Sequence, residues 1–271
     1  YSANVNTFEI KGIASGFTNL VDFGFVSSNR IFATDKDDSR VKVLDRDILE
    51  IISEIETGDS TRPSFIITEW YRSIILNGGE LTSNLKDSTI VAIDHKDEFI
   101  SLASFMGSLY IGENPNSAIN DNDIYILCKG IYDTDNMPTN TNSTLVRVDP
   151  IDFEIKWIEQ LNAYNAKNLV FNENTDELFF TASDGIYNMN KNSSGLNNFL
   201  PDIVSDVLFY NEEEYSYYNP LDSTTTYYNR DVLYFSGSDN DNNIVYKYNL
   251  DLGAYMDTII LDAPVNDINF Y

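Results

Sequence analysis

The chain has 271 residues, of which 17 are Lys or Arg and 43 are Asp or Glu, and its net charge of −26 repels phosphate groups. Binding to nucleic acid and docking on anionic lipid are therefore disfavoured. With Cys128 and His95 as the single cysteine and histidine, an intramolecular disulfide, closed zinc sites and most Ser-His or Cys-His catalytic machinery are excluded, and no apolar run approaches the roughly 20 residues of a transmembrane helix.

The chain begins and ends with one expected strand each. Asn4–Lys11 is a strand with no companion before it, and Ala263–Tyr271 resembles the first strand of a sheet with no companions after it. The first residue is Tyr1 and not Met, so we expect a processed or partial product.

The segment Ser108–Pro150 shows the unit that the rest of the chain repeats. Leu109–Ile111 is a short apolar strand, and Gly112–Pro115 is a turn in which Gly permits unusual backbone angles. Ile124–Cys128 is a continuous apolar run, which predicts a strand buried on both faces. Leu145–Asp149 alternates apolar and polar residues, so one of its faces packs and the other is wetter.

The third strand of this unit recurs in one form along the chain. Its last residues lie 49, 55, 41 and 59 positions apart, and an apolar strand precedes each copy. The copies are Val41–Asp45, Ile90–Asp94, Leu145–Asp149, Ile186–Asn190 and Val245–Asn249. A period of 40 to 50 residues with four short strands predicts a β-propeller, whose blades are four-stranded sheets.

We therefore expect an all-β fold, a β-propeller of four-stranded antiparallel blades in a single domain over residues 1–271. Five full units are expected, at about 20–57, 63–111, 115–161, 165–200 and 203–261. The N- and C-terminal strands would join in one closing blade, which gives six blades, with seven as the alternative. Polar clusters inside the repeats are expected to be loops. They are Asp133–Ser143, Lys191–Asn198 and Asp222–Asn229.

Over Arg30–Tyr271, and most over Gly112–Asn190, the sequence resembles the YncE-like surface propellers of Bacteroidota, a family of unknown function. The resemblance rests on IGENPNSAINDNDIYILCKG, LVRVDP and NLVFNENTDELFFTASDGIYNMN, and on the C-terminal NIVYKYNLDLGAYMDTIILDAPVNDINFY. It implies a secreted propeller on the outer face of the outer membrane, held by a lipid anchor that this chain does not contain. Some relatives work with TonB-dependent transporters and include lipoproteins that capture cobalamin.

The sequence offers little for catalysis. We expect His95 to be a solvated turn residue and Cys128 a buried, small apolar one. Carboxylate pairs could serve glycoside hydrolysis, but so many acidic residues make their proximity uninformative. We expect no cofactor, with calcium as an alternative because acidic loops offer hard oxygen ligands. These loops are Asp35–Asp38, Asn120–Asp123, Asp133–Asn136 and Asp239–Asn242.

Candidate ligand-binding residues lie in turns that a propeller would gather at one mouth of its channel. Amide, guanidinium and aromatic groups would converge there, as in a small-molecule pocket. The candidates are Arg62, Trp70, Asn77, Asn114, Tyr132, Tyr164 and Asn165. The aromatic pairs Trp70-Tyr71, Tyr217-Tyr218 and Tyr227-Tyr228 could form a platform for a flat or extended ligand, although packing in the core explains them as well.

The repeats and the scarcity of catalytic groups predict a non-enzymatic binding propeller. The resemblance implies that it is an accessory to a TonB-dependent transporter at the cell surface and captures a small organic ligand, cobalamin being the first candidate. Two alternatives stay open. One is an interaction or structural subunit of a larger surface assembly, and the other is a carboxylate-based carbohydrate-active enzyme. The expected partners are an outer-membrane transporter or another surface protein.

Overall fold

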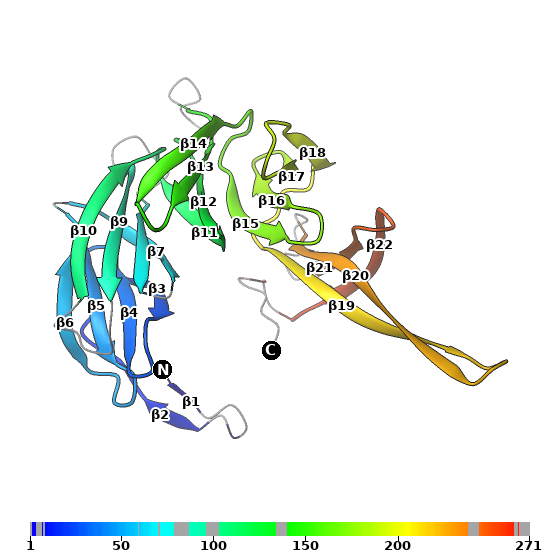
Figure 1. Ribbon diagram of the computed structural model, residues 1–271, viewed down its shortest axis with the longest axis horizontal. Coiled ribbons are helices and arrows are strands. Elements are labelled where there is room, and N and C mark those ends of the chain that lie inside the picture. Colours follow the sequence, from blue (N-terminus) through cyan, green and yellow to red (C-terminus); the bar gives the residue numbers. More distant parts are fainter. Residues whose placement is uncertain are drawn as a thin grey trace. The chain divides into compact units, whose positions relative to one another are not determined.

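A computed structural model describes residues 2–3, 7, 9–58, 60–69, 71–78, 87–95, 103–133, 140–237, 244–262 and 265, with the backbone alone for 2–3 and 103–106. Over these residues the protein is all-β, and it forms two compact units, residues 1–164 and 165–271 (Figure 1). The described part contains no helix that is long and apolar enough to cross a membrane. The single domain expected over 1–271 stays a prediction.

Three four-stranded antiparallel sheets make up the first unit, and in each of them the strands pair in chain order. The first sheet consists of β3 (Leu20–Phe25), β4 (Arg30–Asp35), β5 (Arg40–Asp45) and β6 (Ile51–Glu56). The second consists of β7 (Pro63–Thr68), β8 (Arg72–Asn77), β9 (Thr89–His95) and β10 (Ala103–Tyr110). The third consists of β11 (Pro115–Asp121), β12 (Asp123–Cys128), β13 (Thr144–Asp149) and β14 (Glu154–Gln160).

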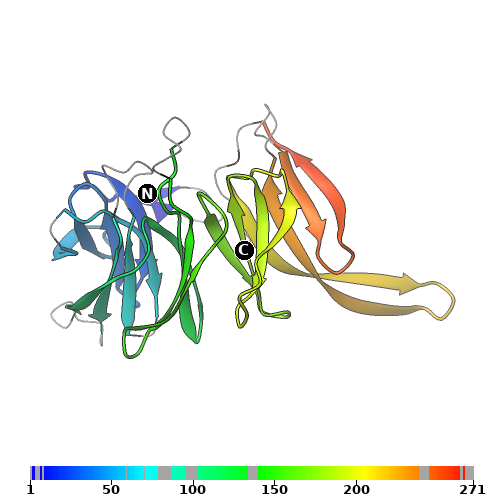
Figure 2. The ribbon, with the colours of Figure 1, turned by 90° about the horizontal axis from the view of Figure 1, so that it is seen from above.

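The second unit contains two more sheets of the same kind. The fourth sheet consists of β15 (Lys167–Asn172), β16 (Glu177–Ala182), β17 (Gly185–Asn190) and β18 (Asn197–Pro201). The fifth consists of β19 (Leu208–Asn219), β20 (Thr224–Ser236), β21 (Ile244–Asn249) and β22 (Ala254–Ile260). Figure 2 shows the hairpin of β19 and β20, in yellow and orange, extending well beyond the other strands of its sheet.

The five sheets fall on the five units expected from the repeats, because each unit contains its own four strands and closing turns. The expected number of blades, six or seven, is not found: the described residues form five four-stranded sheets and one two-stranded sheet of β1 (Ser2–Ala3) and β2 (Ile10–Gly12). The C-terminal strand expected over Ala263–Tyr271 lies outside the described residues except for Val265.

Inner strands are buried on both faces because the sheets of the first unit pack face to face. Ile75 of β8 packs with the first sheet, whereas its neighbours Ile74 and Leu76 point the other way and pack with the third sheet. Side chains alternate along a strand, so a strand between two packed faces must be apolar throughout. Ile124–Cys128 is at most 1% exposed, which confirms its expected burial.

The Asp or Asn that ends most third strands closes the turn that follows. Asp45 accepts hydrogen bonds from the amides of Asp47 at 2.9 Å and Ile48 at 3.3 Å. Asp149, Asn190 and Asn249 likewise accept amide hydrogen bonds two or three residues ahead. This Asx turn accounts for the recurring Asp or Asn, because a short side-chain acceptor replaces a backbone one.

Several expectations about local structure are wrong. The N-terminal strand does have a companion before it, because β1 pairs with β2 through Ala3 and Ile10. His95 is not a solvated turn residue but is 6% exposed, because β9 continues past Asp94 and pairs His95 with Ala103. Its ring packs edge-on against Phe32 at 5.6 Å between centroids. Two expected loops are partly strand: β20 begins at Thr224 within Asp222–Asn229, and β18 begins at Asn197 within Lys191–Asn198.

Candidate functional site

The first strands of the three sheets in the first unit lie next to one another, and they bring together the turns that precede them. Strand β7 contacts both β3 and β11 without belonging to their sheets. Asp22 of β3 accepts a hydrogen bond from the amide of Ile66 in β7 at 2.9 Å. Burial raises the pKa of Asp22, although the bonds from the amides of Ile66 and Phe23 oppose that effect.

Three predicted site residues meet at Asp87, which sequence reasoning missed. The amide of Arg62 donates to Asp87 Oδ2 at 3.0 Å, and the amide of Asn114 donates to the Asp87 carbonyl at 2.6 Å. Asn77 donates to Thr89 Oγ1 at 2.9 Å, and that hydroxyl donates to Asp87 Oδ1 at 3.0 Å. The available signal was the run Asp87-Ser88-Thr89 at the start of a strand, where an acidic side chain accepts from the amides that follow it.

Asn114 also fixes the start of the third sheet. It is 2% exposed and has a left-handed φ of 55°, a conformation that Asn tolerates better than most residues. Its side chain donates to the Gly130 carbonyl at 2.8 Å, so it ties the entry of β11 to the end of β12. Asn114 is therefore mainly a structural residue that shapes the space beside it.

A polar pocket of about 200 Å³ lies beside these turns. It borders the first strands through Val21, Ser64 and Pro115, and Gly78 approaches from the end of β8. The full lining is Val21, Lys36, Ser64, Gly78, Asn114, Pro115, Asn116 and Lys129. Of the predicted site residues only Asn114 lines it directly, while Arg62 and Asn77 support it through Asp87 and Thr89.

Two of the side chains that line the pocket, Lys36 and Lys129, are cationic in a chain of net charge −26. Ammonium and amide donors at a concave surface suit a carboxylate or phosphate oxygen. The volume lies below the roughly 300 to 1,000 Å³ of pockets that enclose a whole drug-sized ligand. The pocket therefore fits a small anion, or one anionic group of a larger ligand.

The remaining predicted site residues do not line this pocket. Trp70 lies outside the described residues. Tyr132 is half-buried, Tyr164 is exposed, and Asn165 has a left-handed φ of 55° in the turn between the third and fourth sheets. Their part in ligand binding stays a prediction.

A second pocket, of about 420 Å³, lies on the face of the first sheet that is turned away from the second sheet. Phe23 and Phe25 line it and are more than half exposed, and the guanidinium of Arg46 lies 4.9 Å from the centre of the Phe25 ring. In a propeller both faces of a blade pack against neighbours, so an open apolar face of this kind suits packing as well as an apolar ligand.

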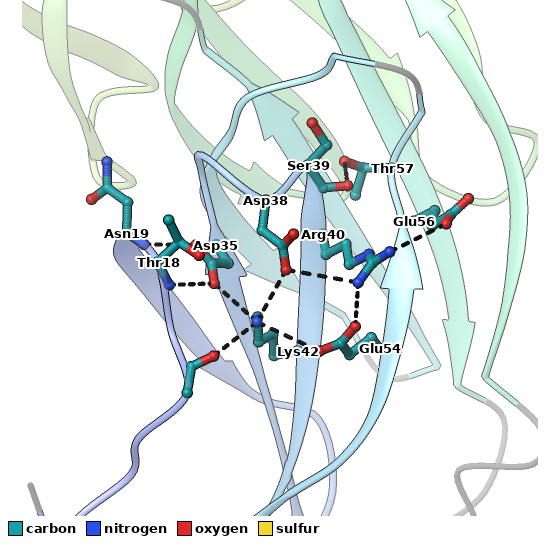
Figure 3. A network of polar contacts seen from close by, with 11 residues as sticks. Thr18, Asn19, Asp35, Asp38, Ser39, Arg40, Lys42, Glu54, Glu56 and Thr57 are labelled. Carbon is teal, nitrogen blue, oxygen red and sulfur yellow. Dashed lines mark hydrogen bonds and ion pairs between the residues drawn. The ribbon is translucent and has the colours of Figure 1, made fainter.

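The acidic loop Asp35–Asp38 is occupied by a buried cation of the chain itself (Figure 3). Lys42 Nζ lies 3.2 Å from Asp35 Oδ2, 3.1 Å from Asp38 Oδ2 and 3.5 Å from Glu54 Oε1. Burial alone would raise the pKa of Asp35, but bonds from the amides of Thr18 and Asn19 and from Lys42 outweigh it and lower the pKa. Calcium is not needed to balance these carboxylates.

Among the described residues no group of three or more Asp, Glu, His and Cys side chains could hold a metal ion. Two of the loops proposed for calcium, Asp133–Asn136 and Asp239–Asn242, lie outside the described residues apart from Asp133. Calcium there stays a prediction.

A serine and the histidine lie close together in the core. Ser73 Oγ and His95 Nε2 are 3.1 Å apart, but Ser73 is 0% exposed. His95 Nδ1 has no hydrogen-bond partner among the described residues, and Asp94 instead accepts from Arg72 Nε at 2.7 Å. A nucleophilic serine needs access to its substrate and a histidine oriented by a third group, and this pair shows neither.

No family model and no curated protein matches the sequence. Solved structures do match. Hydrazine synthase of Kuenenia stuttgartiensis has a TM-score of 0.68 at 10% identity, over 98% of this chain and 81% of that one. BamB from Moraxella catarrhalis has a TM-score of 0.57 at 10% identity, over 99% and 72% of the two chains. Saccharomyces cerevisiae Sqt1 has a TM-score of 0.56 at 11% identity, over 92% and 76%. Likeness at these identities shows the fold alone, a β-propeller fold.

Proposed function

We propose that this protein is a non-enzymatic binding propeller that captures a ligand through an anionic group. The observation that carries the proposal is the polar pocket where three first strands meet, lined by Lys36 and Lys129 in an otherwise acidic chain. Asp87 does not line the pocket, but it accepts hydrogen bonds that hold the neighbouring turns at Arg62 and Asn114 together.

The proposal also includes a cellular role, which the resemblance of the sequence to YncE-like surface propellers supports. In this role the protein is an accessory to an outer-membrane, TonB-dependent transporter at the cell surface, and cobalamin is the first ligand to try. Cobalamin carries a phosphodiester among neutral amide groups, so it offers one anionic group of the size that the pocket accepts. The finer architecture is part of the proposal too: the terminal strands close the sheets into a ring.

The test is calorimetric titration of inorganic phosphate, succinate and cobalamin against the parent protein and a Lys36→Gln/Lys129→Gln variant. Loss of a charge-assisted hydrogen bond weakens binding by about tenfold or more. The matched control is Lys11→Gln/Lys191→Gln, which removes the same charge at lysines that do not line the pocket. The proposal fails if none of the three probes binds the parent, or if the pocket variant binds as the parent does.

One observation favours the second candidate function, a subunit of a cell-surface assembly. The hairpin of β19 and β20 extends beyond its sheet and exposes several tyrosines. Surface tyrosines supply large contact areas at a low cost in conformational entropy, and they are enriched where proteins bind one another. If titration finds no small ligand, this function becomes the better one.

A further inference from the structure

The outer part of the hairpin, residues 214–229, is a two-stranded arm. The pairing of β19 with β20 runs without a bulge from Leu208↔Phe235 to Asn219↔Thr224. Strand β21 pairs with β20 only over Val232–Ser236, so β20 has no partner on its outer edge along the arm. Both edges of the arm therefore present backbone donors and acceptors that no strand of the described sheet uses.

A charged cluster at its base holds the arm in position. Glu213 of β19 binds Arg230 at 2.8 Å and Lys247 at 2.6 Å, and it accepts a hydrogen bond from the Tyr234 hydroxyl. Arg230 also lies over the ring of Tyr215, 5.0 Å from its centre, and that ring stacks on Tyr228 at 5.3 Å. A partner would meet a preorganised arm, which lowers the entropy cost of binding.

The arm carries aromatic side chains on both faces. Tyr215, Tyr217 and Tyr228 lie on one face, and Tyr218 and Tyr227 lie on the other, as the register requires. Tyr217, Tyr218 and Tyr227 are 60%, 57% and 64% exposed. Rings at this exposure are available to stack on cations as well as to cover apolar groups.

Natural sheets protect such edges with lysine, proline or a bulge, and this arm lacks all three within its strands. The only charged residues over 214–229 are Glu214 and Asp222, both acidic. A second copy of this chain, at −26, would be repelled, whereas a cationic segment would be attracted by the carboxylates and by the faces of the rings.

We infer that the arm over residues 214–229 is a docking surface for an extended, lysine- or arginine-bearing segment of another protein, which pairs with an open strand edge and sets its cations against the tyrosines. This is strand addition, in which backbone hydrogen bonds give affinity and side chains give selectivity. The inference does not depend on the polar pocket of the first unit.

The probe is a ten-residue peptide that alternates lysine with valine, and the control peptide carries glutamate in place of each lysine. Binding is measured by fluorescence anisotropy at about 150 mM salt, where long-range attraction is screened. The parent should bind the lysine peptide, and Tyr217→Ser/Tyr218→Ser/Tyr227→Ser should weaken binding about tenfold or more at unchanged net charge. Tyr110→Ser removes a tyrosine of the first unit that is even more exposed, and this variant should bind as the parent does.

A second variant shortens the arm, with Asn-Gly replacing residues 216–227 so that a two-residue turn joins the paired Tyr215 and Tyr228. It should lose the peptide, while the Lys36→Gln/Lys129→Gln pocket variant should retain it. The inference is overturned if the lysine peptide does not bind, if both peptides bind alike, or if the arm variants bind as the parent does. It is also overturned if the parent self-associates and the shortened arm abolishes that, because a second copy is then the occupant.

Discussion

Glu213 of β19 lies 2.6 Å from Lys247 of β21, so their ion pair passes over β20, which separates the two strands. Both side chains are less than one-fifth exposed. Burial alone would raise the pKa of Glu213, but hydrogen bonds from Lys247, Tyr234 and Arg230 outweigh it and lower the pKa to about 2. The base of the arm is therefore held by a carboxylate that stays ionised in moderate acid.

This ion pair predicts a loss of stability in acid. Because the pKa is lower in the folded protein than the ordinary value of 4.5, the stabilisation is complete above pH 4.5 and disappears as the pH falls toward 2. Glu213→Gln should cost on the order of 2 to 3 kcal/mol at pH 7. In urea unfolding followed by circular dichroism, the difference in the free energy of unfolding between Glu213→Gln and the parent should narrow below pH 4.5.

Glu214→Gln is the matched control, because Glu214 is the exposed neighbour on the other face of the arm. Removal of an exposed charge should change stability by less than about 0.5 kcal/mol. If the difference in the free energy of unfolding between Glu213→Gln and the parent stays constant from pH 7 to pH 2.5, Glu213 is not the group that titrates.

The histidine offers a second test of burial. Desolvation lowers the pKa of His95, although hydrogen bonding and the charge of Asp94 oppose it. A histidine whose pKa is lowered on folding stabilises the protein fully above its ordinary value of 6.5, and this stabilisation is lost as the pH falls from 6.5 toward the folded value. A proton NMR titration should give a midpoint below 6.5 for the single imidazole. A midpoint at or above 6.5 would place His95 in solvent, as the sequence first suggested.

Cys128 should be inert in the folded protein. It is 0% exposed in the core of the first unit, and burial raises the pKa of its thiol to about 12, so almost no nucleophilic thiolate is present at pH 8. Ellman's reagent should release no colour from native protein and one equivalent after denaturation in guanidinium. Because the chain has a single cysteine, any rapid reaction in native buffer would contradict the buried placement.

The sequence predicts the repeating sheets well because their physical causes are local. Continuous apolar runs such as Ile124–Cys128 mark strands packed on both faces, and the Asp or Asn at the end of a third strand marks its closing turn. The repeats of these two patterns place one four-stranded sheet in each of the five expected units. The expectation of a loop over Asp222–Asn229 is wrong because a genuine turn at Pro220 is followed directly by threonines and tyrosines, which suit a strand.

Tertiary pairing explains what the sequence could not show. His95 is buried because β9 continues past Asp94 beside β10 and faces Phe32, a residue more than 60 positions earlier. Lys42 alternates with valines in a strand and looks solvated, but the N-terminal segment covers it and the Gly16 carbonyl accepts its hydrogen bond at 2.9 Å. Asp87 was overlooked because its partners, Arg62 and Asn114, come from two other turns.

The last prediction concerns Gly78, where the end of β8 passes close to β11. A Cβ atom on Gly78 would lie 2.5 Å from the Pro115 carbonyl oxygen and 2.5 Å from Ser64 Oγ, closer than atoms can approach. The amide of Gly78 donates to that same Ser64 hydroxyl at 3.0 Å. Gly78→Ala should therefore destabilise the protein by about 1 to 3 kcal/mol through overpacking, and it should also reduce binding in the polar pocket that Gly78 and Pro115 line.

Two further variants make the result specific. Gly107→Ala is the control, since a Cβ atom there meets nothing within 4 Å, and it should leave stability within about 0.5 kcal/mol of the parent. Ser64→Ala combined with Gly78→Ala should not restore stability, because it removes one obstacle and leaves the backbone oxygen of Pro115 in place. Thermal unfolding of the four proteins checks this order. If Gly78→Ala unfolds at the same temperature as the parent, β8 and β11 do not approach as closely as the structure places them. The polar pocket beside them must then have another shape.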